Sequence, residues 1–316
     1  MRAGAAQALG PGIDGYEVVV VDDGSRDGTA AHLKAHAAAY PHVRLLEHGR
    51  NRGAAAARNT GVAAAAGEVI VFIDSDLVVC PAFLRAHAAG LAEARARDGD
   101  DRTFTYGRVV HTNDFADPAA ARFKASDASA AFFATGNVAI AKARLLGAAG
   151  AAPADGPFDA AFSAYGWEDL ELGERLRQRG AKLKRVPEAV GWHWHPEFSV
   201  ERIPALVRQE EERGANGARF LRKHPNLRVR LMVQLTPLHL LFWGLLTLGG
   251  LLDARRLTPL LAWLCRRGHP RAAFFLLTPY LNWVSMRAAA RAYRRPQSPG
   301  RRRAGSAAAA AAAAAG

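Results

Sequence analysis

The sequence has little cysteine, no apolar stretch at its N-terminus and almost no acid after residue 221. The two cysteines, Cys80 and Cys265, match no metal-ligand spacing, which excludes a disulfide framework and fits a reducing cytosol. The opening MRAGAAQALGPG has one arginine but no apolar core, so it is not a signal peptide. We therefore expect the folded body of the protein to stay in the cytoplasm.

The positive charge of the chain lies in its C-terminal part. The 316 residues carry 42 Lys and Arg against 29 Asp and Glu. Residues 222–316 hold 16 of the basic residues and one acid, Asp253, which leaves 26 basic and 28 acidic residues in 1–221. No aromatic residue interleaves with the basic run 301–303, so a nucleic-acid partner is disfavoured. Half of the residues are hydrophobic, enough to bury a core.

Strand-like and helix-like segments alternate from residue 16 onward. Strands are expected at 17–21, 43–46 and 68–73, helices at 29–36, 53–66 and 168–179, and a last extended segment at 186–195. β-Branched runs separated by helices are typical of buried parallel strands. The sequence therefore predicts an α/β fold with a mostly parallel sheet flanked by helices.

Acidic clusters follow two of the predicted strands. Asp22 and Asp23 end the first strand, and Asp74 and Asp76 end the strand at 68–73. Ligands of open α/β sheets bind at the carboxyl ends of strands, so we expect both clusters to face one crevice. Asp74 and Asp76 project to the same side of an extended segment and can hold a hard cation such as Mn²⁺ or Mg²⁺. The alternative is that these residues only favour turns.

Three ordered segments carry a resemblance to a known family. VVVVDDGSRDGT (18–29), NRGAAAARNTGVAAAAGEVIVFIDSD (51–76) and YGWEDLELGERL (165–176) resemble family 2 glycosyltransferases of the GT-A fold. The resemblance covers about residues 16–200 and implies a metal-dependent, inverting transferase that uses a nucleotide sugar, with UDP as the expected nucleotide. It places Asp23 at the uracil, Asp74 at the ribose and Asp76 at the metal. The donor-binding residues that it implies are Asp22, Asp23, Ser25, Asn51, Gly53, Arg58 and Asp74.

A second acidic motif lies at the start of the helix expected at 168–179. Acids at a helix N-terminus are favoured by the helix dipole, which is the structural explanation for Glu168 and Asp169. An inverting sugar transfer also needs a base for the acceptor hydroxyl. The resemblance assigns this role to Asp169. We expect Glu168 to bind substrate hydroxyls and Trp167 to stack on the acceptor sugar.

Two histidines alternate with tryptophans in the last extended segment. His193 and His195 lie on one face of it, because alternate residues of a strand share a face. In the resembled family a histidine after a Val-Pro turn completes the metal site, and counting from Val186 the matching position is His193. His195 is the second choice, and packing of the flanking tryptophans is the structural alternative.

The resemblance also implies one more strand and helix before the Asp-Asp motif. Only residues 1–15 precede the first predicted strand, so we expect a sheet that lacks its first strand and has an open edge or gap.

The C-terminal part contains a long apolar run. Residues 231–252 are 22 uncharged positions, enough for a membrane span. A single span would export the 12 arginines that follow, against the positive-inside tendency. We therefore expect amphipathic or re-entrant segments on an anionic cytoplasmic membrane surface. An ordinary buried helical subdomain is the alternative.

These observations predict three regions: a catalytic domain at 1–221, a basic and apolar membrane-associating helical region at 222–295, and a disordered Arg/Ala-rich tail at 296–316. The predicted function is transfer of a hexose from a nucleotide-sugar donor to a glycan or lipid-linked acceptor, for cell-envelope polysaccharide, at the cytoplasmic face of the cell membrane. A sugar nucleotidyltransferase and a non-catalytic membrane-associated scaffold are the alternatives.

Overall fold

The computed structural model describes residues 7, 9–10, 12–148 and 156–295, and the predicted tail at 296–316 lies outside them. The strands are β1 (Val18–Asp22), β2 (Val43–Glu47), β3 (Val69–Ile73), β4 (Leu77–Val79), β5 (Thr103–Thr112), β6 (Asn137–Ala141) and β7 (Lys182–Trp194). The α-helices are α1 (Thr29–Ala35), α2 (Ala54–Ala64), α3 (Phe83–Asp98), α4 (Lys142–Ala148), α5 (Glu168–Gln178), α6 (Ile203–Lys223), α7 (Leu227–Met232), α8 (Pro237–Leu246), α9 (Ala254–Arg266) and α10 (Pro270–Arg294). Short 3₁₀ helices are η1 (Ala37–Ala39), η2 (Pro118–Ala120), η3 (Ala125–Asp127), η4 (Val200–Arg202) and η5 (Leu248–Gly250).

The strands form two sheets. β1 and β2 pair in parallel, and the second sheet has the order β3-β6-β5-β7-β4. The α/β class with helices around the sheet and a helical C-terminal region is confirmed, and the strand directions are mixed. In the part of the chain that the structure describes, β3–β6, β5–β6 and β4–β7 are antiparallel, and only β1–β2 and β5–β7 are parallel. β5 reaches β6 through irregular segments and short 3₁₀ helices, without the crossover α-helix that usually joins parallel neighbours, and these two strands are antiparallel.

Helix α2 connects the two sheets. Its Ala55 and Val62 belong to the main core with Phe72 of β3. On its other side, a Cβ on Gly61 would lie 3.5 Å from the Val21 side chain of β1. Among the described residues, β1 pairs only with β2, and β3 pairs only with β6. Among the residues that the structure describes, each of these two strands therefore has one edge with no strand beside it.

Aromatic side chains fill the main core between the five-stranded sheet and α5. Phe72 packs edge to face against Phe158, with ring centroids 5.4 Å apart, and Phe104 packs in the same way against Phe133. Leu172 and Leu176 of α5 complete the cluster and are fully buried. This packing fixes the start of α5 against the sheet, which is where the candidate site lies.

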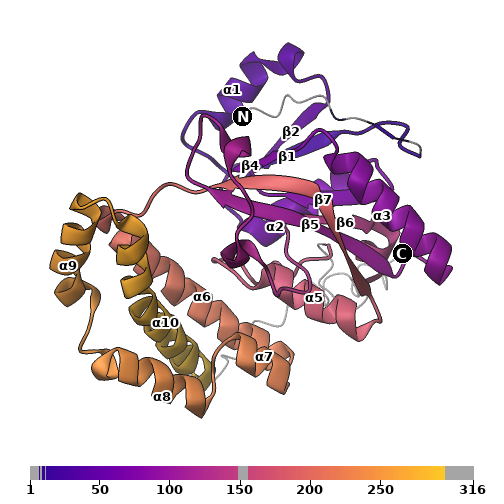
Figure 1. The fold of residues 1–316 in the computed structure, drawn as a ribbon. Helices are drawn as coiled ribbons and strands as arrows, with labels where there is room; N and C mark the ends of the chain where they lie inside the picture. The colour runs from indigo at the N-terminus through magenta and orange to yellow at the C-terminus, as the bar shows by residue number, and fades with distance from the viewer. Residues whose placement is uncertain (1–6, 8, 11, 149–155, 296–316) are drawn as a thin grey trace, which may run out of the picture.

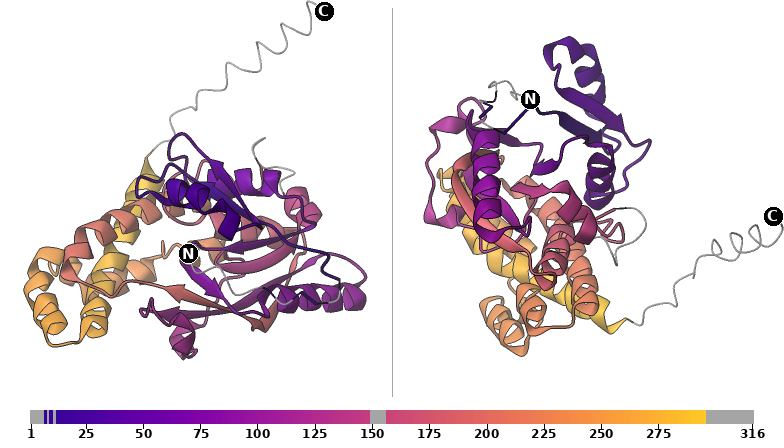
Figure 2. Two further views of the ribbon diagram at one scale, coloured as in Figure 1. Left: turned by 90° about the horizontal axis from the view of Figure 1, so that it is seen from above. Right: turned by 90° about the vertical axis from the view of Figure 1, so that its right-hand side faces the viewer.

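The C-terminal helices form a separate bundle below the five-stranded sheet, on the side away from β1, β2 and α1 (Figures 1 and 2). α6 and α10 pack side by side so closely that a Cβ on Gly214 of α6 would collide with the Ser285 carbonyl of α10. The far end of α6 contacts the loop before α5 through Phe220, which packs on Trp167. α6 therefore links the bundle to the candidate site.

The apolar run at 231–252 does not form one continuous helix. The stretch Leu227–Leu246 is long and apolar enough to cross a membrane by length and composition, and 11% of its most apolar window is buried. Its backbone breaks between α7 and α8, where Gln234 has a φ of 57° and Pro237 begins the next helix. α8 has 10 residues and is about 15 Å long, half of the roughly 30 Å apolar core of a bilayer.

Candidate active site

The aspartate pair after β1 organises two loops. Asp22 is 6% exposed and accepts a hydrogen bond from the Ser25 backbone amide at 2.7 Å, which lowers the pKa of its carboxyl. Asp23 accepts hydrogen bonds from the backbone amides of Arg52 and Gly53 at 2.8 to 3.0 Å. We expected both aspartates and Ser25 to contact the donor. In the structure Asp22 and Ser25 form the turn, and Asp23 holds the loop that contains Asn51. Their contacts with a donor stay a prediction.

Two glycines allow these loops to approach each other. Gly24 has a φ of 82°, and a Cβ on it would lie 2.9 Å from the Asn51 amide nitrogen. Gly53 has a φ of 90°, and a Cβ on it would lie 2.7 Å from the Ser163 carbonyl oxygen. A side chain at either position would meet both backbone strain and a steric clash. Gly53 thus joins the Asp23 loop to the segment that leads into α5.

The two aspartates after β3 meet a histidine of β7. β4 pairs with β7 so that Leu77 lies opposite His193, which brings His193 next to the preceding Asp76. Its Nε2 lies 2.8 Å from Asp76 Oδ1 and 4.0 Å from Asp74 Oδ2. One ligand atom from each of the three lies within 4.8 Å of the others. Strand register therefore assembles two carboxylates and one imidazole, a donor set that suits Mn²⁺ or Mg²⁺.

Space for a ligand beside Asp74 depends on a residue without a side chain. A Cβ on Gly136 would lie 3.0 Å from Asp74 Oδ2, so any larger residue would fill the position next to this oxygen. Burial raises the pKa of Asp74, while the nearby Arg58 opposes that rise. A cation bound here would favour the ionised carboxylate.

Arg58 of α2 connects the metal-ligand group to the start of α5. Its guanidinium donates a hydrogen bond to Glu168 Oε1 at 2.7 Å and lies 3.8 Å from Asp74 Oδ1. The second oxygen of Glu168, Oε2, is buried and has no hydrogen-bond partner among the described residues. Leaving such an atom unsatisfied costs about 1–3 kcal/mol, so Glu168 is suited to accept a hydrogen bond from a bound hydroxyl.

The carboxyl of Asp169, the residue after Glu168, has a raised pKa. The Asp169 residue is half-buried. Burial is the larger cause that raises the pKa of Asp169 to about 6, and the neighbouring Glu168 carboxylate is the second. Its Oδ1 accepts a hydrogen bond from the Leu170 backbone amide at 2.7 Å. A carboxylate with this pKa is ionised at neutral pH and is more basic than an ordinary aspartate.

The turn before α5 has a strained backbone that α6 holds in place. Gly166 and Trp167 have φ values of 86° and 78°, a conformation that is uncommon for a residue with a side chain. Asn216 of α6 donates hydrogen bonds to the carbonyls of residues 164–166 at 2.9 to 3.3 Å. Trp167 Nε1 donates to the Arg213 carbonyl at 2.7 Å. α6 therefore sets the direction in which Glu168 and Asp169 enter the site.

Trp167 supports the strained turn. Its side chain packs on Phe220, carries the Arg213 guanidinium 5.7 Å from its ring centroid, and leaves the residue 9% exposed. Stacking of this ring on an acceptor sugar stays a prediction.

Sequence reasoning missed several residues that shape the site. His48 Nδ1 donates a hydrogen bond to Asp23 Oδ1 at 2.6 Å, and its Nε2 lies 2.9 Å from the Thr60 hydroxyl oxygen, yet it belongs to no recognisable motif. Asn216 lies in a helix 47 residues after Asp169 and has no local signal. Only three-dimensional contact reveals both.

Comparison with known proteins gives a family match for part of the chain. Residues 5–126 match the family described as Glycosyl transferase family 2. The matched stretch includes the Asp22–Asp23 turn, α2 with Arg58, and the Asp74–Asp76 pair.

Two of the similar proteins are glycosyltransferases by name. The uncharacterized glycosyltransferase YibD of Escherichia coli is 45% identical over 65 residues, 21% of this chain and 19% of the relative. The pre-mycofactocin glycosyltransferase of Mycobacterium tuberculosis is 25% identical over 256 residues, 78% of this chain and 51% of the relative. The matched stretches span about a fifth of the first curated relatives.

A solved structure is also similar. It is the mannosyltransferase PcManGT from Pyrobaculum calidifontis in complex with GDP-Man and Mn²⁺, with a TM-score of 0.45 and 21% identity, over 88% of this chain and 77% of that one.

Proposed function

We propose that the protein is a metal-dependent, inverting glycosyltransferase that moves a hexose from a nucleotide sugar, with UDP as the expected nucleotide, to a glycan or lipid-linked acceptor. The observation that carries this proposal is the chain of contacts from the Asp74–Asp76–His193 group through Arg58 to Glu168 and its neighbour Asp169. The Arg58 guanidinium thus contacts Asp74, a candidate metal ligand, and also Glu168, the residue before the candidate base Asp169.

The donor diphosphate is expected between the metal ligands and Arg58. Asp74, Asp76 and His193 would hold Mn²⁺ or Mg²⁺, which when bound supplies positive charge to the diphosphate leaving group. Arg58 can add hydrogen bonds to phosphate oxygens, a contact that guanidinium groups often make with two oxygens at once. Asn51 and Gly53 lie on the loop held by Asp23 and would contact the remaining part of the donor.

The transfer itself needs one base. Asp169 takes the proton of the acceptor hydroxyl while the hydroxyl oxygen bonds to the anomeric carbon and the bond from that carbon to the diphosphate breaks. This is a single displacement with inversion, and no covalent bond to the enzyme forms. The unpaired Glu168 Oε2 would accept a hydrogen bond from a substrate hydroxyl.

A donor screen tests the proposal. The purified protein with Mn²⁺ is incubated with a panel of nucleotide sugars, and release of the nucleoside diphosphate is measured. Asp169→Asn should lower transfer by at least about a hundredfold while binding of UDP and Mn²⁺ is retained. Asp101→Asn, an exposed aspartate in a surface ion pair with Arg95, is the matched control. Normal transfer by Asp169→Asn would exclude this base.

The same screen separates the alternatives. Release of pyrophosphate would indicate a nucleotidyltransferase. A protein that binds no nucleotide sugar with Mn²⁺ in calorimetry would fit a scaffold.

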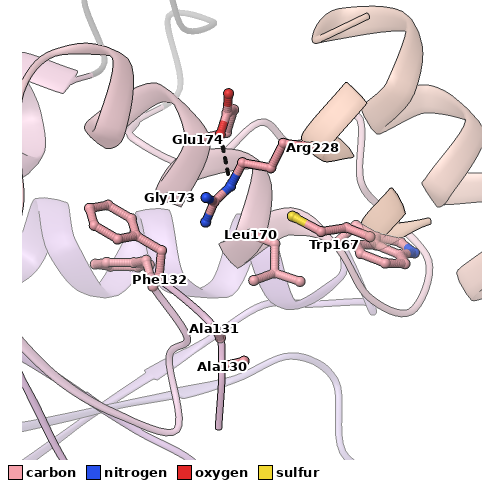
Figure 3. A pocket seen from close by; sticks show the side chains of 10 residues that line it. Ala130, Ala131, Phe132, Trp167, Leu170, Gly173, Glu174 and Arg228 are labelled. Carbon is pink, nitrogen blue, oxygen red and sulfur yellow. Dashed lines mark ion pairs between the residues drawn. The ribbon is translucent and has the colours of Figure 1, made fainter. Parts of the chain in front are cut away.

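An apolar cavity along α5 supports an acceptor with an apolar part. Its volume is about 270 Å³, and Trp167, Leu170 and Gly173 are among its lining residues, whereas Glu168 and Asp169 are not (Figure 3). Phe132 and Met232 contribute further apolar surface, and the pair Glu174–Arg228 lies at one side. Such a cavity can take the lipid portion of a lipid-linked acceptor.

The apolar surface of α8 supports membrane association. Its exposed fractions reach 70% at Leu238, 61% at Leu241 and 66% at Leu245, three positions that follow helical spacing. A patch of this kind on a protein surface marks an interaction site. Because α8 is too short to span a bilayer, we propose that it lies in the membrane surface, with basic residues of α9 near anionic lipid headgroups.

Vesicle binding tests this placement. The wild-type protein should sediment with vesicles that contain phosphatidylglycerol, less with phosphatidylcholine alone, and less again at high salt. The double variant Leu241→Glu/Leu245→Glu should lose most of this binding. Phe115→Ser, which removes an apolar side chain that is 72% exposed and belongs to the loop after β5, is the control. Equal sedimentation of the double variant would exclude α8 as the contact.

A further inference from the structure

Beside the Asp74–Asp76–His193 group lies a second cluster of ligand atoms that the proposed reaction does not use. It consists of His111, His193 and His195, and we call it the histidine cluster. β5 and β7 run in parallel with His111 opposite His193, and His195 follows two residues later on the same face. The His195 backbone amide donates a hydrogen bond to the Thr112 carbonyl at 2.8 Å. The β5–β7 ladder therefore continues one residue past the end of β7.

The three rings lie close together. His195 Nε2 is 3.0 Å from His111 Nδ1, and the centroids of His193 and His195 are 4.1 Å apart. One nitrogen from each ring lies within 4.8 Å of the others. Ligands of a tetrahedral zinc ion with Zn–N bonds of about 2.0–2.1 Å are separated by roughly 3.3 Å. Small ring rotations therefore suffice to direct three nitrogens at one ion, and the exposure of His111 and His195 leaves room for a water as the fourth ligand.

The two groups of ligands differ in the metal that they favour. Three imidazoles suit Zn²⁺, Ni²⁺ or Cu²⁺, whereas carboxylate oxygens suit Mg²⁺ and Mn²⁺. Both groups contain His193, whose Nε2 already lies 2.8 Å from Asp76. A neutral imidazole has a free lone pair on only one of its two nitrogens, so His193 can ligate one ion at a time.

We propose that the histidine cluster is a binding site for a transition-metal ion of the Zn²⁺ class, and that its occupation withdraws His193 from the Asp74–Asp76 pair. Zinc at this site is then an inhibitor that competes with the hard cation through one shared ligand. The competition rests on the proposed function, but zinc binding itself does not.

Metal binding is measured without any transfer reaction. The full chain is titrated with Zn²⁺ by calorimetry and with Co²⁺ by visible absorption, where a tetrahedral histidine site gives intense bands. We expect one equivalent per wild-type chain, at least about tenfold weaker binding in His111→Ala, and retained binding in Asp76→Asn, which keeps all three histidines. His269→Ala, at an exposed histidine outside the cluster, is the matched control.

Three outcomes would overturn the proposal: no Zn²⁺ bound by the wild type, equal binding by His111→Ala, or loss of Zn²⁺ binding in Asp76→Asn. His32→Ala tests the stacked pair His32–His36 on the surface of α1, and loss of binding there would move the site away from the cluster.

Competition is read from bound Mn²⁺ by electron paramagnetic resonance. Zn²⁺ should release Mn²⁺ from the wild type at concentrations that leave Mn²⁺ bound to His111→Ala. Release from both to the same extent would mean that Zn²⁺ simply replaces Mn²⁺ on the aspartates, and would refute competition through His193. His111 contributes no ligand atom to the Asp74–Asp76–His193 group. The His111→Ala variant should therefore keep the transfer rate that the wild type shows with Mn²⁺ alone.

Discussion

The ionisation of Asp169 makes the pH dependence of transfer the sharpest test of the site. Its carboxyl, with a pKa of about 6, must be ionised to accept a proton. At pH 7 about nine tenths of it is ionised and at pH 5 about one tenth, so kcat/KM should fall roughly tenfold between these values as pH decreases. The ordinary aspartate pKa of 3.8 would instead leave activity almost unchanged over this range.

Two neighbours should move this profile in opposite directions. The Glu168 carboxylate raises the pKa of Asp169, and the Arg58 guanidinium lowers it. Glu168→Gln should therefore shift the acid limb to lower pH, and Arg58→Gln should shift it to higher pH. Both residues also contact substrate in the proposed reaction, so the plateau will drop in each variant, and only the position of the limb is diagnostic.

The assay measures nucleoside diphosphate release from pH 4.5 to 8 at saturating Mn²⁺. Glu188→Gln, an exposed glutamate of β7, is the control and should leave the limb in place. Because burial also raises the pKa of Asp74, each profile is repeated at two Mn²⁺ concentrations. A limb that moves with Mn²⁺ reports Asp74, and a limb that ignores both neighbouring substitutions refutes the assignment of Asp169.

Three further predictions concern the residues that support the site. Asn216→Ala removes the donor to the carbonyls of residues 164–166 and should lower kcat more than it changes the KM for donor; an unchanged kcat would show that the strained turn holds itself. Gly53→Ala forces a Cβ against the Ser163 carbonyl at a φ of 90°, and chemical denaturation should reveal a loss of about 1–3 kcal/mol; full stability would mean that the loop moves freely. Burial lowers the pKa of His87 from 6.5 to about 4, so its contribution to stability is present above pH 6.5 and is lost as pH falls through the folded pKa. Wild type should lose about 2 kcal/mol more than His87→Gln between pH 7.5 and pH 5 in urea unfolding, and parallel losses would contradict this.

The elements that carry strong local patterns were predictable. The valine run at β1, the apolar run at β3 and the alanine-rich α2 have the expected type within one or two residues, and α5 begins at Glu168 as expected. Local propensity and capping determine such segments, and tertiary contacts only need to agree with them. The region 103–141 gave no clear pattern, because β5 and β6 obtain their pairing from strands distant in sequence.

The candidate site also has parts that the sequence predicts and parts that depend on distant contacts. Its chemical groups are readable from sequence, since Asp74, Asp76, Glu168 and Asp169 follow a strand or begin a helix, where acids have physical reasons to lie. Their partners are not readable. Arg58 reaches Glu168 across 110 positions of sequence, and nothing local announces that contact.

The sequence by itself determined which side chains could do chemistry, the helix–strand alternation, and the separation of an acidic body from an arginine-rich C-terminal part. Only the tertiary structure decided how those side chains act. It showed that Asp22 caps a turn and that Trp167 packs on Phe220, and it placed His193 beside two aspartates and two other histidines. The reason is physical: burial, strand register and charge proximity set the pKa values and ligand geometry, and all three depend on residues that are distant along the chain.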